Sequence, residues 1–548
     1  MVTRSASQNN MNDNKIATLF YYDCQSGEQA FSCEEDTVLI CETLKGLDFE
    51  ILSEDSFEDE VAIDSDDAED DVHPEDEDSS GSDTEMNHVD KQIGKNSTSH
   101  SSKGIPVMKN IRPIDLDKFL KKVADEKSCS SCILLYFIVP QEGYEFKTRE
   151  GKTLPLFNMW KKFTGASCPV LFFIQANVTE GAIVQDVLFN KDNSSPESLS
   201  SAYVMPEASN MLLAYLPRCI GAKKSVAQIL SEELPKPYDI NTCLTQVIAQ
   251  LNAMDCRPNP KFSSTLLNPL YLSKREKADI LMSVEPPGYT IKRKCLVYAF
   301  LFAKFNDETL MELTSMLEKD RESIEKTFTE PAFELEFSVP ENGIMTVNEF
   351  RHKLYSITSD AEKMESCDCI MIILSSHGGE SDVVFTYDGH FRMDEARRAL
   401  SMCKELKGKP KVIIRDACRG GGFEVIHYDE LKKVKHTVID NSALSIPLDL
   451  EMTKDYCEMT DVLVAMASTK RMESFGTYCH GSLFIEALCN YINEKRNEDM
   501  LTVLQVVIKT IAERTIPLLT DEGCLENAKQ LATFTSTLQK TLKLPVNK

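Results

Sequence analysis

The stretches IMIILSSHGG (370–379) and PKVIIRDACRGGG (410–422) each begin as a continuous apolar run and end in polar residues and glycines. Continuous apolar runs are typical of strands that are buried on both faces of a parallel sheet. The segment between them, RMDEARRALSMCKEL (392–406), has the period of a helix. Strands alternating with helices predict an α/β fold, with a mostly parallel central sheet flanked by helices.

Similar stretches occur in the same order in the first half of the chain. ILLYFIVPQEG (133–143) matches the first stretch, and PVLFFIQANVTEG (169–181) matches the second. Near the end of each half, KFSSTLLNPLYL (261–272) matches TFTSTLQKTLKL (533–544). Three matches in one order indicate a tandem duplication of a unit of about 230 to 280 residues, much longer than a solenoid repeat. We therefore expect two α/β sandwiches in tandem.

The duplication predicts the division of the chain. We expect a flexible N-terminus (1–15), a first copy (16–272), a linker (273–292) and a second copy (293–548). An acidic, serine-rich insertion at about 54–104 interrupts the first copy and carries much of the net charge of −27. This composition cannot bury enough apolar surface to order a backbone. The insertion is therefore expected to be a disordered loop, either a solvated spacer or a regulatory arm.

His377 and Cys418 stand where the two apolar runs of the second half end. A thiol attacks an amide as the thiolate, so a catalytic cysteine needs a nearby imidazole. The carboxyl ends of parallel strands meet at one edge of the sheet, where open α/β sheets place their ligands. The neighbouring glycines make the backbone N–H groups of Gly378 and Cys418 suitable oxyanion donors. The pattern predicts a cysteine endopeptidase with His377 as base and Cys418 as nucleophile.

The motifs SSHGG and DACRG resemble those of the caspases, whose signatures are S-H-G on one strand and Q-A-C-R-G on another. The resemblance extends over about 295–544 and, more weakly, over the first copy. It implies a peptidase that cleaves after aspartate in apoptotic or innate-immune signalling. It also implies a large part to about 425, an intersubunit linker at about 423–460 and a small part to 548. In that linker Asp440 is the candidate processing site, an uncut loop being the alternative.

In the first copy the family's catalytic positions hold other residues. The base position is assigned to Val139, the following glycine position to Pro140 and the nucleophile position to Asn177. Valine accepts no proton, an asparagine amide is not a nucleophile, and proline has no N–H to donate. The first copy is therefore expected to be a degenerate domain that binds or scaffolds.

The second copy departs from the family at the pocket that, in caspases, holds the substrate aspartate with two arginines and a glutamine. Asp416 stands at the glutamine position and presents a negative charge to a negative substrate side chain. One arginine position falls on Gly476, or on Thr477 if the gap shifts by one, and the loop carrying the other arginine is absent between Phe305 and Thr314. We expect reduced or altered specificity for aspartate.

Two functions follow from these features. The dyad favours a caspase-like endopeptidase acting on protein substrates, whereas the altered pocket favours a catalytically weak modulator that pairs with active caspases. Caspase domains pair through their final edge strands. The matched stretches around Phe262 and Phe534 therefore predict an intramolecular pseudo-dimer of the two copies, homo- and hetero-dimers being the alternatives.

Composition argues against several other classes of protein. The chain lacks the clustered positive charge that nucleic-acid binding needs. The apolar run CLVYAFLFA (295–303) is far shorter than the roughly 20 residues that span a bilayer. The 18 cysteines are scattered, as is typical of reduced thiols in a cytosolic or nuclear protein. We expect a cytoplasmic protein with no metal site, no cofactor and no membrane contact.

Overall fold

The computed structural model describes residues 14–22, 33–53, 56, 106–128, 130–142, 145–148, 150–154, 156–178, 208–218, 222–256, 259–273, 285–379, 382–419, 460–469, 472–477, 479–519 and 525–545. Apart from Ser56 and Thr460, the expected insertion at 54–104 and the expected intersubunit linker at 423–460 lie outside these residues, and so does Asp440.

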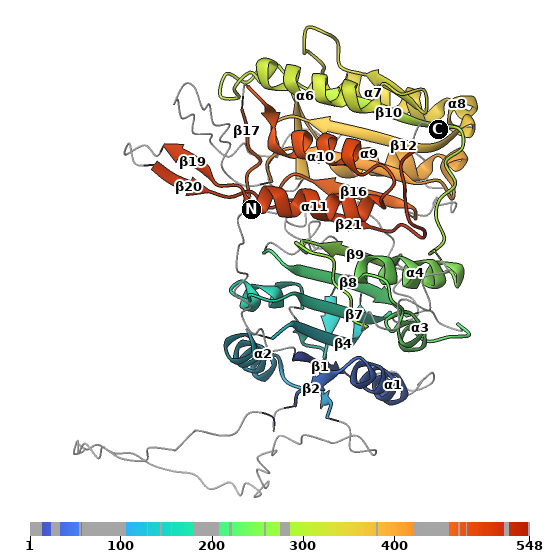
Figure 1. The fold of residues 1–548 in the computed structure, drawn as a ribbon, viewed down its shortest axis with the longest axis vertical. Coiled ribbons are helices and arrows are strands. Elements are labelled where there is room, and N and C mark those ends of the chain that lie inside the picture. The colour runs from blue at the N-terminus through green and yellow to red at the C-terminus, as the bar shows by residue number, and fades with distance from the viewer. Residues whose placement is uncertain are drawn as a thin grey trace, which may run out of the picture.

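One mixed sheet runs through both halves of the molecule (Figure 1). In the second half, five strands pair in parallel in the order β11-β10-β12-β15-β16, and β21 pairs antiparallel with β16. Their bounds are β10 (Lys294–Leu301), β11 (Phe333–Phe337), β12 (Cys367–Ser375), β15 (Lys411–Asp416), β16 (Val462–Met466) and β21 (Thr533–Ser536).

The first half repeats this strand order. Five strands pair in parallel in the order β2-β1-β4-β7-β8, and β9 pairs antiparallel with β8. Their bounds are β1 (Lys15–Tyr21), β2 (Phe49–Ile51), β4 (Cys132–Glu142), β7 (Val170–Val178), β8 (Met211–Pro217) and β9 (Lys261–Ser264). The mostly parallel sheet predicted from the apolar runs is confirmed.

The two halves join through their last strands. β9 and β21 pair antiparallel at the centre of the sheet, with Ser263 opposite Thr535 (Figure 1). The hydroxyls of these two residues hydrogen-bond at 2.7 Å, and the Thr533 hydroxyl donates to the Ser264 carbonyl at 3.1 Å. Matched strands that pair with each other give the halves the arrangement of an isologous dimer within one chain.

Helices cover both faces of the sheet, as the α/β prediction requires. The helices of the first half are α1 (Cys33–Gly46), α2 (Pro113–Lys127), the 3-10 helix η2 (Leu156–Phe163), α3 (Val226–Glu233) and α4 (Ile240–Ala253). Those of the second half are α6 (Thr314–Phe328), α7 (Val347–Ser359), α8 (Ala361–Ser366), α9 (Met393–Met402), the 3-10 helix η6 (Lys404–Leu406), α10 (Leu483–Glu494) and α11 (Met500–Glu513).

Local sequence explains where several helices begin. α7 starts with a capping box, in which Thr346 and Glu349 satisfy each other's backbone N–H groups. Ser225 and Gln228 do the same for α3. Pro113 opens α2, at the position where a missing N–H costs nothing.

Short strands lie outside the main strand order. They form three hairpins, β13 (Val383–Thr386) with β14 (Gly389–Arg392), β17 (Gly476–Thr477) with β18 (Gly481–Ser482), and β19 (Ile516–Leu519) with β20 (Leu525–Ala528). The remaining ones are β3 (Met108–Lys109), which pairs with β1, and β5 (Glu145–Lys147) and β6 (Thr153–Leu154), which extend from β4.

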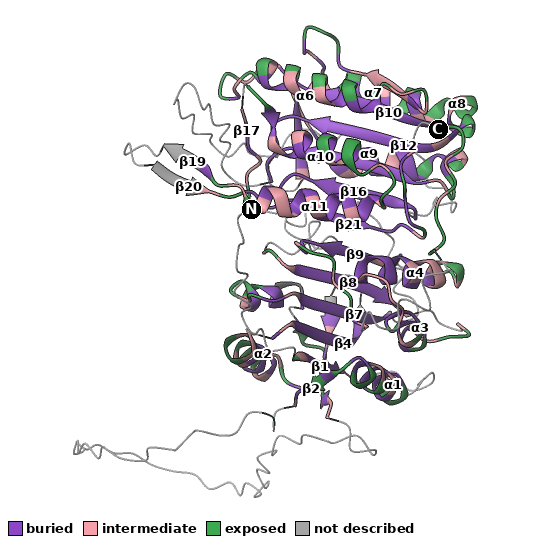
Figure 2. Ribbon diagram, in the orientation of Figure 1, coloured by how far each residue is buried: buried purple, intermediate pink, exposed green. Residues whose placement is uncertain are grey.

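The hydrophobic core is continuous across the junction on one face of the sheet. Side chains from α1, α3 and α4 of the first half and from α6, α10 and α11 of the second belong to one cluster of buried residues. On the opposite face each half has its own cluster, and Figure 2 shows the strands of both halves as buried. The two halves therefore share a core as well as a sheet.

Candidate active site

His377 and Cys418 follow two neighbouring strands of the second half. β12 and β15 pair in parallel with Ser375 opposite Asp416, and the Ser376 N–H donates to the Asp416 carbonyl at 3.1 Å. His377 and Cys418 each come two residues after that matched pair. The structure therefore brings the expected base and nucleophile to the same edge of the sheet.

A backbone carbonyl fixes the imidazole of His377. Its Nε2 lies 2.8 Å from the Met311 carbonyl oxygen, and the ring packs against Phe305 with centroids 4.9 Å apart. Because a carbonyl only accepts, Nε2 carries the proton in this contact. In the neutral imidazole the other nitrogen, Nδ1, is then the one that can take a proton. Met311 lies 66 residues before His377, and no sequence pattern identified it.

The thiol of Cys418 is enclosed and protonated. The residue is 4% exposed. The Ser474 N–H donates to Sγ at 3.4 Å, and Sγ lies 3.7 Å from the Ser474 carbonyl oxygen. Burial raises the thiol pKa to about 12, and the Ser474 N–H opposes part of that rise. In this conformation the nucleophile is stored as a neutral thiol.

Gly378 lies so close to the nucleophile loop that no side chain fits there. A Cβ at this position would come 2.4 Å from the Cys418 carbonyl oxygen and 2.8 Å from both the Ala417 Cβ and an Arg415 nitrogen. Contacts this short exclude any residue other than glycine unless the backbone moves. Glycine here keeps the backbone after the base against the backbone of the nucleophile.

Arg415 is a fully buried cation beneath this contact, and sequence reasoning did not single it out. Its guanidinium donates to the carbonyls of Ala417 at 3.2 Å, Cys418 at 3.0 Å and Val383 at 3.0 Å. Burial lowers the pKa of Arg415 to about 10, so it stays charged at neutral pH. One side chain thus connects the loop after Cys418 to the loop after His377.

Asp416 lies beside the nucleophile and is surrounded by hydroxyl groups. Ser375 and Ser474 donate to its carboxylate at 3.2 and 2.8 Å, and the Ser482 hydroxyl is a further hydrogen-bond partner. Burial raises its pKa, and the hydroxyl groups oppose that rise. The position expected to receive an anionic substrate group therefore holds a buried acid.

A second buried acid, Asp320, comes from α6. It accepts the Ser482 N–H at 2.8 Å, so Ser482 connects it to Asp416. Burial and then the negative charge of Asp416 raise the pKa of Asp320 well above its usual range. The sequence held one usable signal, because Asp320 lies four residues from both Met316 and Ile324 on the buried stripe of the helix.

Gly476, the other residue expected in the altered pocket, lies against Met316. A Cβ at Gly476 would come 2.3 Å from the Met316 sulfur. The thioether therefore occupies the space into which a side chain at position 476 would point. Thr477, the alternative assignment, follows in the same short strand β17.

In the first half the ladder register corrects one assignment. β4 and β7 pair with Pro140 opposite Asn177, and the matched strands of the second half continue from Ser375 opposite Asp416 toward His377 beside Cys418. Pro140, not Val139, therefore stands at the base position, and Gln141, not Pro140, at the glycine position. The missing proline N–H is no longer an argument against catalysis. A proline ring takes up no proton either, so the first half still lacks a base as well as a thiol.

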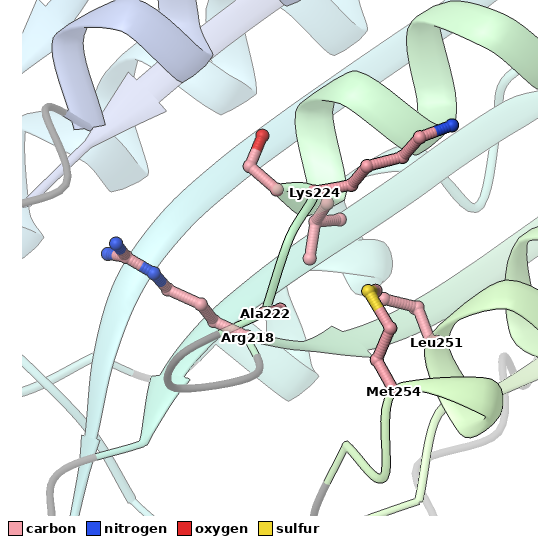
Figure 3. Close-up of a pocket in the computed structure, with 7 residues that line it drawn as sticks. Arg218, Ala222, Lys224, Leu251 and Met254 are labelled. Carbon is pink, nitrogen blue, oxygen red and sulfur yellow. The ribbon is translucent and has the colours of Figure 1, made fainter.

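A shallow hollow lies near this edge of the first half (Figure 3). Arg218, which follows β8, borders it, and its N–H donates to the Ala176 carbonyl beside Asn177 at 2.8 Å. Lys224, Leu251 and Met254 also line it. Its lining combines two basic side chains, of which Lys224 is paired with Glu232, with apolar ones.

The cysteine expectation needs one correction. Among the described cysteines eleven are free, but Cys256 is disulfide-bonded, so the prediction of reduced thiols is wrong at that position.

Within the described ranges, no helix is both long and apolar enough to cross a membrane.

Comparison with known proteins finds similarity to the caspases in the second half of the chain. A model of the caspase domain matches residues 302–543. Caspase-8 of Rattus norvegicus is 27% identical over 275 residues, covering 47% of this chain and 53% of the relative, and caspase-6 of Gallus gallus is 22% identical over 228 residues, covering 41% and 71%. The crystal structure of caspase-1 from Spodoptera frugiperda has a TM-score of 0.37 at 19% identity and covers 48% of this chain and 94% of that one. The chain spans about half the length of the caspase-8 proteins it matches. Residues 302–543 of this chain therefore form a caspase domain.

Proposed function

We propose that the second half is a cysteine endopeptidase with Cys418 as nucleophile and His377 as general base. The observation that carries the proposal is the placement of the two residues after neighbouring parallel strands, with Gly378 against the Cys418 carbonyl. This placement supports transfer of the Sγ proton to Nδ1 of His377 as sulfur attacks the scissile carbonyl. The N–H groups of Gly378 and Cys418 would stabilise the oxyanion.

The remaining steps follow the chemistry of an acyl-enzyme. The proton held on His377 passes to the leaving amine, and the acyl group stays on Sγ as a thioester. Water then attacks the thioester, gives a proton to His377 and releases the acid product and the thiol. The Met311 carbonyl supports both steps, because it stabilises the imidazolium through Nε2.

The proposed enzyme has weak specificity for aspartate. Asp416 and Asp320 are acids where a substrate aspartate would need cations, and Gly476 has no side chain. Charge-assisted hydrogen bonds contribute about 1.5–3 kcal/mol each. Loss of two of them lowers the efficiency toward aspartate by roughly 10²- to 10⁴-fold.

The first half is proposed to act as a built-in partner. The edge of β21 is paired with β9, and the aromatic rings of Phe262 and Phe534 meet across the junction. Another caspase could use that edge only by displacing β9. This observation favours the endopeptidase over a modulator that pairs with active caspases. We expect the chain to sediment as a monomer of 61.7 kDa.

The setting proposed from the resemblance is apoptotic or innate-immune signalling in the cytoplasm, with a cut at Asp440 separating a large and a small part. The test is cleavage of a peptide library by the full chain and by Cys418→Ala. We expect cleavage and covalent labelling by a thiol-reactive peptide only with Cys418 present. Indistinguishable profiles together with absent labelling would refute the enzyme. Capture of active caspases by the same variant would then support the modulator.

A further inference from the structure

Nothing else in the described chain explains why a buried acid stands at position 320. It is 1% exposed, and its Oδ2 has no hydrogen-bond partner among the described residues. Most buried polar atoms in proteins are paired, so an orphaned carboxyl oxygen needs an explanation. A buried carboxyl oxygen without a partner also destabilises the fold, which points to a use other than stability.

Among the described residues, the cations nearest the two acids are already engaged with other groups. Arg415 is close enough for its charge to lower the pKa of Asp416. Arg419 pairs with Asp382 at 2.5 Å, and Glu486 pairs with Arg514 at 2.9 Å. Among the described residues no cation is paired with Asp320, and burial and the charge of Asp416 raise its pKa well above the usual range. An incoming cation would stabilise the ionised form of this acid.

The two acids are linked to the nucleophile through one short segment. Asp416 precedes Cys418 by two residues, and residues at that spacing on an extended chain share a face. Ser474 contacts the Cys418 sulfur with its backbone and donates to Asp416 with its hydroxyl at 2.8 Å. Gly476, two residues on, pairs with Ser482, whose N–H donates to Asp320. The segment from Ser474 to Gly476 therefore leads from the nucleophile to both acids.

The space beside Gly476 is filled by a side chain that can leave it. The Met316 sulfur occupies that space, one helical turn before Asp320 on α6. Methionine is unbranched and has three rotatable bonds, so it yields more easily than a branched residue. Gly476 itself adds no bulk. A long, straight cationic side chain suits a passage of this kind better than a short one does.

We propose that Asp320 and Asp416 form a specificity site for a lysine or arginine side chain in the substrate residue before the scissile bond. This inference rests on the proposed peptidase activity and names its substrate class. Asp320 supplies the unpaired carboxylate oxygen, and Asp416 adds a second acid beside the sulfur. The same acids repel a substrate aspartate.

The test uses the full chain and three matched fluorogenic peptides that carry arginine, citrulline or aspartate before the scissile bond. We expect kcat/KM for arginine to exceed that for citrulline, its neutral analogue, by about 10- to 150-fold, as one charge-assisted contact provides. Asp320→Asn keeps an acceptor for Ser482 and should abolish the difference. The control is Glu322→Gln, an exposed acid on the same helix, which should leave the difference unchanged.

Equal rates for arginine and citrulline in the wild type would overturn the specificity site, and so would preference for aspartate. Binding of the same peptides to Cys418→Ala separates the site from the chemistry. If no peptide is cleaved but the variant binds the arginine peptide at least about tenfold more tightly than the other two, the acidic site stands and the peptidase fails. Equal binding of all three peptides would refute the site whether or not any peptide is cleaved.

Discussion

Phe262 of the first half and Phe534 of the second meet edge to face at the centre of the sheet, with ring centroids 6.0 Å apart and planes at 80°. Both rings are buried, and each belongs to the strand that pairs the halves. Edge-to-face aromatic pairs contribute beyond their buried area. The pair therefore joins the matched ends of the two copies.

Phe262→Ala should destabilise the whole chain. Removing a buried phenylalanine costs about 3–5 kcal/mol, because the surroundings close only partly around the cavity. Urea unfolding followed by circular dichroism measures the loss. Tyr355→Ala, at a residue that is 70% exposed, is the matched control and should change the free energy of unfolding by less than about 0.5 kcal/mol. Equal effects of the two substitutions would contradict a tightly packed junction.

Gly378→Ala should remove activity while leaving most of the fold in place. The added Cβ would overlap the Cys418 carbonyl oxygen, so the base and nucleophile loops must separate. Displacement of catalytic groups by about 1 Å costs roughly 100-fold in rate, and loss of an oxyanion donor adds to it. The measurement is kcat/KM on the best library peptide. Gly165→Ala, where a Cβ meets nothing within 4 Å, should retain full activity.

Arg415→Met should lower stability more than loss of an exposed arginine does. The substitution keeps much of the side-chain volume but leaves the carbonyls of Val383, Ala417 and Cys418 without their donor. We expect a loss of about 3 kcal/mol in the free energy of unfolding. Arg112→Met provides the comparison, since that side chain is 62% exposed. A loss no larger than in the control would show that the three carbonyls find other donors.

Alkylation of Cys418 in the absence of peptide should be slow and steeply dependent on pH. Because burial raises the thiol pKa to about 12, the thiolate fraction grows about tenfold for each pH unit between 7 and 9. Iodoacetamide labelling followed by mass spectrometry gives the rate at each pH. Cys479, which is exposed, serves as the internal reference in the same sample. A Cys418 rate that equals the Cys479 rate at pH 7 would contradict the enclosed thiol.

Asp499 should make stability depend on pH. Burial and the charge of Asp239 from the first half raise its pKa to about 7, while the Leu542 N–H bond opposes that rise. Between about pH 4 and 7 the folded state keeps a proton that the unfolded state has released. The free energy of unfolding that this proton contributes is therefore fully present at low pH and is lost as the pH rises through 7. Asp499→Asn keeps the acceptor for Leu542 and should flatten the profile. Parallel urea profiles for the two proteins from pH 5 to 8 would refute this linkage.

Much of the fold could be predicted because the apolar runs are long. The stretch around Ile370 reads as a strand buried on both faces, and the one around Ile413 does likewise, which gave the parallel sheet and the shared edge for His377 and Cys418. The short stretches around Phe262 and Phe534 could be matched because both halves of the chain contain the same pattern.

The missed features depend on contacts between distant segments. The correspondence of Pro140 with His377 follows from the register of the paired strands, and the two matched stretches give the same result when they are aligned from Ile133 and Ile370. Met311, Arg415 and Asp320 act through side chains or carbonyls brought together only by folding. Of these, Asp320 alone left a trace in the sequence, as an acid on the apolar stripe of a helix.

The pairing of β9 with β21 makes assembly of the two halves a unimolecular event. Partners that are covalently linked meet at an effective concentration in the millimolar range for a short linker, whatever the amount of protein in the cell. Dilution, expression level and clustering therefore leave the pairing unchanged. Control of the second half must come from steps that alter one molecule at a time, such as a cut in the chain or the arrival of a substrate.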